Sequence, residues 1–119
     1  MLPLLHFQSY QEFQHALEQV QMRIAATDLQ EVALPESFQN VQRLFECQIA
    51  SLSADDVTPD DAARWQSIQT EIHKQMRLLA TDIMLLQASR SSATFQRRVL
   101  GIGTRLDTLI QYCEVLLQM

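Results

Sequence analysis

Apolar residues recur at spacings of three and four along most of the chain, which is the pattern of one face of an α-helix. The motif Ser9-Tyr-Gln-Glu12 has the form of a capping box, so it predicts that a first helix begins there and ends near Gln30. Pro35 is typical of the first turn of a second helix. The first stripe holds Tyr10, Phe13, Leu17, Val20 and Ile24, and the second holds Phe38, Val41, Leu44, Phe45, Ile49 and Leu52.

Two longer stripes fill the second half of the chain. Thr58-Pro59-Asp60-Asp61 supplies an N-cap, a proline and two acids that favour a helix start, so a third helix is expected from Pro59 to about Ser89. Ser91-Ser92 ends it and caps a fourth. The third stripe holds Trp65, Ile68, Ile72, Met76, Leu79, Ile83 and Leu86, widened by Leu78 and Leu85, and the fourth holds Phe95, Val99, Ile102, Leu106, Leu109, Cys113 and Leu116.

Four amphipathic helices with short links predict an all-α fold, a four-helix antiparallel bundle with long third and fourth helices. A chain of 119 residues has room for a single domain, residues 1–119. A helix of about 30 residues reaches about 45 Å, and the second helix would cover roughly half of that length. The core left uncovered favours a homodimer. Gly101 and Gly103 inside the fourth stripe are expected to permit a close helix crossing or a local bend.

Composition narrows the possible partners and the location. The net charge is −5 and Lys74 is the single lysine, so nucleic acid and anionic membrane surfaces are poor electrostatic matches. No apolar run approaches the roughly 20 residues that span a bilayer, and the start of the chain does not resemble a signal peptide. Cys47 and Cys113 have no metal-type spacing, so we expect a cytoplasmic protein with reduced thiols.

The chain offers little catalytic chemistry. A di-iron bundle needs two Glu-x-x-His pairs, and Glu12-Phe-Gln-His15 is one pair, best read as a chance surface pair. His73-Lys74 is a fragment of a phosphotransfer signature without its glycine. Neither cysteine has a histidine nearby in sequence. We therefore expect no catalytic residue, no metal-binding residue and no cofactor.

The charged residues are unevenly placed. Arg90, Arg97 and Arg98 cluster around the third turn, and Asp55, Asp56, Asp60 and Asp61 cluster around the second. In an up-and-down bundle these turns lie at opposite ends. Helix dipoles favour the acids, but Arg97 and Arg98 sit near the start of the fourth helix, against its dipole. These arginines therefore need an anionic partner, inside the protein or on another one.

Asp82 lies within the apolar stretch Arg77–Leu86. If the chain reverses near Ser91, Asp82 is level with about Leu100, and Arg98 lies within about one helical turn of that level. The sequence thus predicts a structural ion pair between Asp82 and Arg98 that fixes helix register. The alternative is an exposed Asp82, and a catalytic role is the least favoured interpretation.

The second half of the chain resembles a known family. The residues that carry the resemblance are Thr70-Glu71-Ile72, Lys74 to Leu79, Asp82, Leu86-Gln87-Ala88, Arg90, Thr94, Arg97-Arg98, Arg105-Leu106 and Tyr112-Cys113. Over residues 65–117 these positions are similar to the cyanobacterial PatD family, while the first two helices match only in length and helical character. The positions that carry the resemblance form no catalytic motif.

The resemblance implies a non-enzymatic regulator of heterocyst frequency that binds the cell-division protein FtsZ and promotes filament bundling. Arg90, Arg97 and Arg98 are the residues that we expect to contact an acidic partner. The alternative is a generic helical adaptor or chaperone-like module that engages an amphipathic helix of its partner.

Overall fold

The computed structural model describes residues 2–25 and 33–119, and within them the chain is all-α. The helices are α1 (Leu4–Ala25), α2 (Ala33–Leu44), α3 (Pro59–Gln87) and α4 (Ser92–Leu117). A π-helical turn, η1 (Phe45–Ile49), continues α2, and a 3-10 turn, η2 (Ala54–Asp56), precedes α3. These described residues form no strand, so the predicted all-α class is confirmed.

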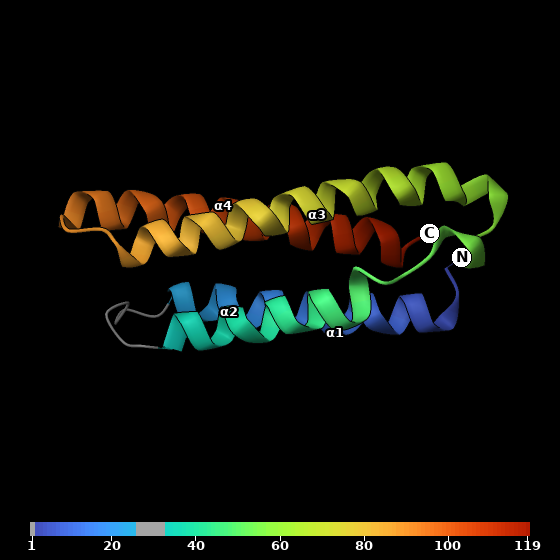
Figure 1. Cartoon of the computed structure of the whole chain (residues 1–119), viewed down its shortest axis with the longest axis horizontal. Coiled ribbons are helices and arrows are strands. Elements are labelled where there is room, and N and C mark those ends of the chain that lie inside the picture. Colours follow the sequence, from blue (N-terminus) through green and yellow to red (C-terminus); the bar gives the residue numbers. More distant parts are fainter. Residues whose placement is uncertain (1, 26–32) are drawn as a thin grey trace.

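The helices form an elongated particle of 50 × 21 × 19 Å. Helices α1 and α2 lie side by side in one layer and α3 and α4 in the other, and α4 also packs on α1 (Figure 1). The lengths differ: α3 has 29 residues and α4 has 26, whereas α2 has 12. The turn between α3 and α4 lies at one end of the long axis and the start of α3 lies at the other (Figure 1).

The limits of α3 and α4 follow the sequence signals. Helix α3 begins at Pro59, as predicted, and ends two residues before the predicted limit. The hydroxyl of Ser91 accepts a hydrogen bond of 3.1 Å from the amide of Thr94 and so caps α4. Most residues of the predicted stripes are buried, from Trp65 to Leu86 on α3 and from Val99 to Leu116 on α4, while Ile68 and Phe95 are partly buried.

Helix α1 begins earlier than predicted. It starts at Leu4, where the carbonyl of Pro3 accepts a 3.0 Å hydrogen bond from the amide of Phe7, so the proposed capping box lies inside the helix. The error has a physical cause, because His6 and Ser9 occupy the buried face of this first part of the helix. Polar residues on the core-facing side of the helix interrupt the spacing of apolar residues on which the prediction depended.

The second stripe also differs from a regular helix. Phe38, Val41 and Ile49 are buried as predicted, but the chain winds into η1 before reaching Ile49. The amide of Ala50 donates to the carbonyl of Phe45 at 2.8 Å, which closes the wider π-helical ring. Sequence periodicity did not predict this turn.

Two further expectations about packing are wrong. Leu78 and Leu85 do not widen the core, because they remain 36% and 44% exposed. Gly101 and Gly103 do not permit a close crossing, because a Cβ atom added to either would meet no atom within 4 Å. The local bend stays a prediction.

Candidate functional site

Asp82 lies at the contact between α3 and α4, where Arg105 reaches across from α4. The Nε of Arg105 donates to Asp82 Oδ2 at 2.6 Å, and its Nη1 donates to Gln75 Oε1 at 2.8 Å. The side chains of Arg105 and Asp82 are 26% and 27% exposed. Since Gln75 and Asp82 are two helical turns apart on α3, the guanidinium is held at two levels and fixes the register of the helices.

The predicted partner of Asp82 was therefore wrong: the carboxylate pairs with Arg105 and not with Arg98. The chain runs outward past the end of α3 before α4 begins (Figure 1). The sequence predicted that Asp82 is level with Leu100. In the structure it contacts Arg105, which lies about 7.5 Å farther along α4. The ion pair itself was anticipated from the position of an acid among apolar residues.

Replacing Asp82 with alanine is expected to lower the free energy of unfolding by about 1–2 kcal/mol, because Arg105 then keeps Gln75 alone as a partner in a half-buried site. Chemical and thermal denaturation measure the change. Asp56→Ala, at an exposed aspartate in η2, is the matched control and should change stability by less than about 0.5 kcal/mol. An Asp82 variant as stable as its control would show that the pair does not hold the register.

Arg90, Arg97 and Arg98 gather around the turn between α3 and α4, and we call this region the arginine end. Arg90 and Arg97 are exposed. Arg98 is half-buried, and its Nε has no hydrogen-bond partner among the described residues. A hollow of about 300 Å³ beside the turn is lined by Ser89, Arg90, Ser91, Ser92 and Phe95. The arginine end can thus offer cationic and hydroxyl donors to an anionic group.

The aspartates around the start of α3 lie at the other end of the long axis (Figure 1). There the amide of Asp55 donates to the hydroxyl of Ser53 at 3.1 Å, and the hydroxyl of Thr58 donates to Asp61 at 3.3 Å. Asp60 and Asp61 in the first turn of α3 suit the helix dipole, and Pro59 suits this position because the first turn needs no hydrogen bond from its missing N–H. The particle therefore carries basic and acidic groups at opposite ends.

The histidines of the two weak sequence motifs lie at the surface. His15 and its neighbour Glu12 are exposed, and the exposed ring of His73 packs edge-on against Phe45 with 4.9 Å between ring centroids. Within residues 2–25 and 33–119, no three His, Cys, Asp or Glu side chains come close enough to hold a metal ion.

The two cysteines have different environments. Cys47 is exposed and Cys113 is buried in the α4 seam, and neither forms a disulfide. Burial, and to a smaller extent the charges of Glu114 and Glu18, raises the pKa of Cys113 to about 12. The Cys113 thiol is therefore a neutral core group at physiological pH.

A buried polar network joins three elements, and sequence reasoning missed it. The hydroxyl of Tyr10 on α1 donates to Gln69 Oε1 on α3 at 2.6 Å, and Gln69 Nε2 donates to the carbonyl of Ile49 in η1 at 2.8 Å. His6 lies nearby, with Nε2 3.1 Å from the carbonyl of Ser53. The available signal was the position of Gln69, which falls on the apolar stripe between Trp65 and Ile72 where only a satisfied polar group is tolerated.

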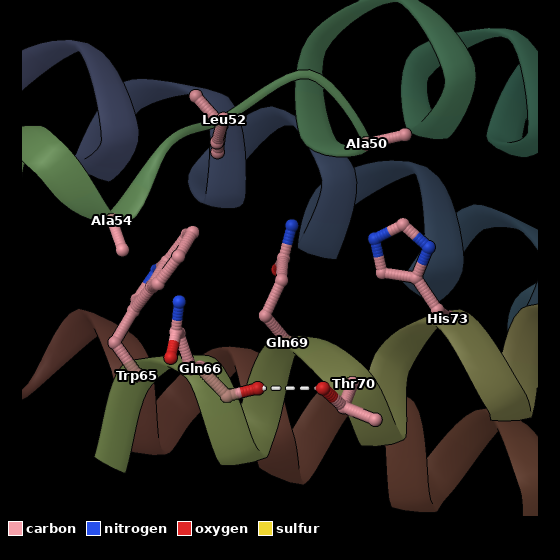
Figure 2. A pocket seen from close by; sticks show the side chains of 8 residues that line it. All are labelled: Ala50, Leu52, Ala54, Trp65, Gln66, Gln69, Thr70 and His73. Carbon is pink, nitrogen blue, oxygen red and sulfur yellow. Dashed lines mark hydrogen bonds between the residues drawn. The ribbon is translucent and has the colours of Figure 1, made fainter. Parts of the chain in front are cut away.

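A hollow of about 550 Å³ opens beside this network. Figure 2 shows Trp65, Gln69 and His73 pointing from α3 toward the segment that carries Ala50 and Leu52. His73 is the one titratable side chain that lines this hollow. The other lining side chains are aromatic, aliphatic, amide or hydroxyl groups, so the hollow contains no acid–base pair.

None of the described helices is both long enough and apolar enough to cross a membrane. Comparison with known proteins adds no assignment: no protein-family model, no curated protein and no solved structure matches this chain.

Proposed function

We propose that this protein is a non-enzymatic cytoplasmic regulator that binds FtsZ and modulates the assembly and bundling of its filaments, and thereby influences cell division and heterocyst frequency in cyanobacteria. The name of the partner rests on the resemblance over residues 65–117. The observation that carries a binding role is the arginine end, where Arg90 and Arg97 are exposed without an ion-pair partner among the described residues.

A bundling activity requires two filament contacts on each particle. We propose that the chain forms an antiparallel four-helix bundle that pairs into a homodimer, so that two-fold symmetry presents the arginine end twice. Acidic side chains on the filament would complement the exposed guanidinium groups, which favour carboxylates through paired hydrogen bonds.

Charge reversal tests the contact. The double variant Arg90→Glu with Arg97→Glu is expected to lose co-sedimentation with FtsZ filaments while keeping its helical circular dichroism, because both side chains are exposed. Arg64→Glu with Lys74→Glu changes the net charge equally at two exposed residues away from the arginine end and should bind normally. Light scattering of each variant reports the oligomeric state. Full binding by the Arg90 and Arg97 variant would refute the site.

A further inference from the structure

Two pairs of buried side chains face each other between α1 and α3. His6 and Tyr10 lie one helical turn apart on the same face of α1, and Trp65 and Gln69 are spaced in the same way on α3. The ring of His6 packs against that of Trp65, with 5.6 Å between the ring centroids and 54° between the ring planes. The hydroxyl of Tyr10 donates to Gln69 at 2.6 Å. We call these residues the buried quartet.

The quartet lies where two helices are joined by side chains alone. Each of its members is at most 7% exposed. In the described part of the chain, α1 packs closely on α2, α4 and η1, and α3 packs closely on α4 and η2, but the backbones of α1 and α3 do not approach each other closely. The side chains of the quartet therefore bridge the distance between α1 and α3.

Most of the hydrogen-bonding groups in the quartet already have partners. Gln69 uses both ends of its amide, because Oε1 accepts from Tyr10 and Nε2 donates to the carbonyl of Ile49 at 2.8 Å. The Nε2 of His6 lies 3.1 Å from the carbonyl of Ser53. A carbonyl only accepts, so Nε2 is the nitrogen that carries the proton, and the Nδ1 of the neutral ring is an acceptor.

Two buried polar atoms of the quartet have no hydrogen-bond partner among the described residues: Nδ1 of His6 and Nε1 of Trp65. Burial raises the pKa of Tyr10 and the Trp65 N–H lowers it in part, so the indole nitrogen lies on the side of the phenol without bonding it in good geometry. One of the two atoms is a donor and the other is an acceptor. Buried polar groups without a protein partner are commonly satisfied by an ordered water.

We propose that the buried quartet holds one ordered water molecule, which accepts a hydrogen bond from Trp65 Nε1 and donates one to His6 Nδ1. Two to four hydrogen bonds to buried groups are the usual complement of an internal water. The partners select this ligand, because a metal cation cannot accept from the indole N–H and a halide anion cannot donate to Nδ1. The bond between Tyr10 and Gln69 is already complete and needs no water.

The site has a route to solvent. Trp65 and Gln69 also line the hollow of about 550 Å³, where both side chains project from α3 (Figure 2). The water links α1 to α3 and, through His6 and Ser53, to the segment that precedes η2. The inference depends neither on the filament partner nor on the arginine end.

Magnetisation transfer between water and the indole proton tests the proposal. Trp65 is the single tryptophan, so its Nε1 proton gives one NMR signal of this type. A long-lived internal water should give this proton a cross peak at the water frequency with opposite signs in laboratory-frame and rotating-frame Overhauser spectra, whereas chemical exchange gives the same sign in both. The ¹⁵N signal of His6 Nδ1 should lie upfield of that of a free acceptor nitrogen, because it receives a hydrogen bond.

Matched variants locate the water. His6→Phe keeps an aromatic ring but removes the acceptor, so it is expected to lose the cross peak, whereas His15→Phe, at an exposed histidine of α1, should keep it. Tyr10→Phe should also keep it, which shows that the signal is not relayed by an exchanging phenol proton. Circular dichroism checks that each variant keeps its helices.

Three results would overturn the inference. The first is the absence of the cross peak in the wild type, which needs no variant to fold. The second is a cross peak that survives in a folded His6→Phe protein, and the third is its loss in Tyr10→Phe. None of these measurements involves FtsZ, so failure of the proposed function and failure of this inference are distinguishable.

Discussion

Replacing Gln69 with leucine is expected to lower the free energy of unfolding by about 3 kcal/mol, and the melting temperature by about 10 °C. Leucine has a similar volume, but it leaves the hydroxyl of Tyr10 without its acceptor and removes one of the donors to the carbonyl of Ile49. Tyr10 is fully buried and Gln69 is 7% exposed, so water does not readily replace these bonds. Urea denaturation followed by circular dichroism measures the loss.

A double-mutant cycle isolates the hydrogen bond from the change of shape. Tyr10→Phe should cost the wild type about 1 kcal/mol and should cost the Gln69→Leu variant nothing, because its hydroxyl is already unsatisfied there. Gln66→Leu, at an exposed position on α3, is the control and should stay within about 0.5 kcal/mol of the wild type. Additive losses across the cycle would contradict a coupled network.

Raising the pH from 9 to 12 is expected to destabilise the protein through Cys113 by up to about 4 kcal/mol. Burial raises the pKa of this thiol from its ordinary value of 9.0 to about 12. In that window the unfolded chain releases the proton and the folded chain retains it, so stability falls as pH rises. The contribution is fully present below pH 9.

Cys113→Ala removes this titration. Between pH 8 and pH 11 the stability of the wild type should fall by about 3 kcal/mol more than that of Cys113→Ala, as measured by urea denaturation at each pH. Burial also raises the pKa of Tyr10, and the charge of Cys113 adds a smaller upward contribution, so only the part of the Tyr10 effect that is due to burial cancels in the difference. Cys47→Ala, at the exposed cysteine, should follow the wild type. Parallel pH profiles for wild type and Cys113→Ala would contradict the prediction.

Sequence was most informative where apolar spacing and capping signals agreed. The start of α3 at Pro59 and the cap of α4 at Ser91 combine a local chemical requirement with a long apolar stripe, and both were predicted. The capping residues and the apolar spacing are independent signals at these positions, so their agreement leaves few alternative positions for the helix ends.

Prediction failed where a polar residue faces the core, because its role depends on a partner distant in sequence. His6 and Gln69 are acceptable inside only through the carbonyls of Ser53 and Ile49. No local pattern contains that information. The same is true of η1, the wider turn that ends at Ile49, whose carbonyl accepts the hydrogen bond from Gln69.

The ion pair of Asp82 illustrates a partial success. An acid among apolar residues implies that a cation lies opposite, and the structure does place a cation, Arg105, against Asp82. The identity of this cation, Arg105 in place of the predicted Arg98, depends on how far the connection carries the chain beyond α3, which is a tertiary property.

Because the particle is 50 Å long, its basic and acidic ends interact separately with other molecules. At physiological ionic strength the Debye length is about 8 Å, so the two ends are separated by several screening lengths. A molecule approaching Arg90 and Arg97 therefore does not sense the aspartates at the far end, and the net charge of −5 does not describe what it meets. Only in very dilute salt, near 0.01 M, where the Debye length is about 30 Å, would the acidic end begin to repel an anionic partner from the basic one.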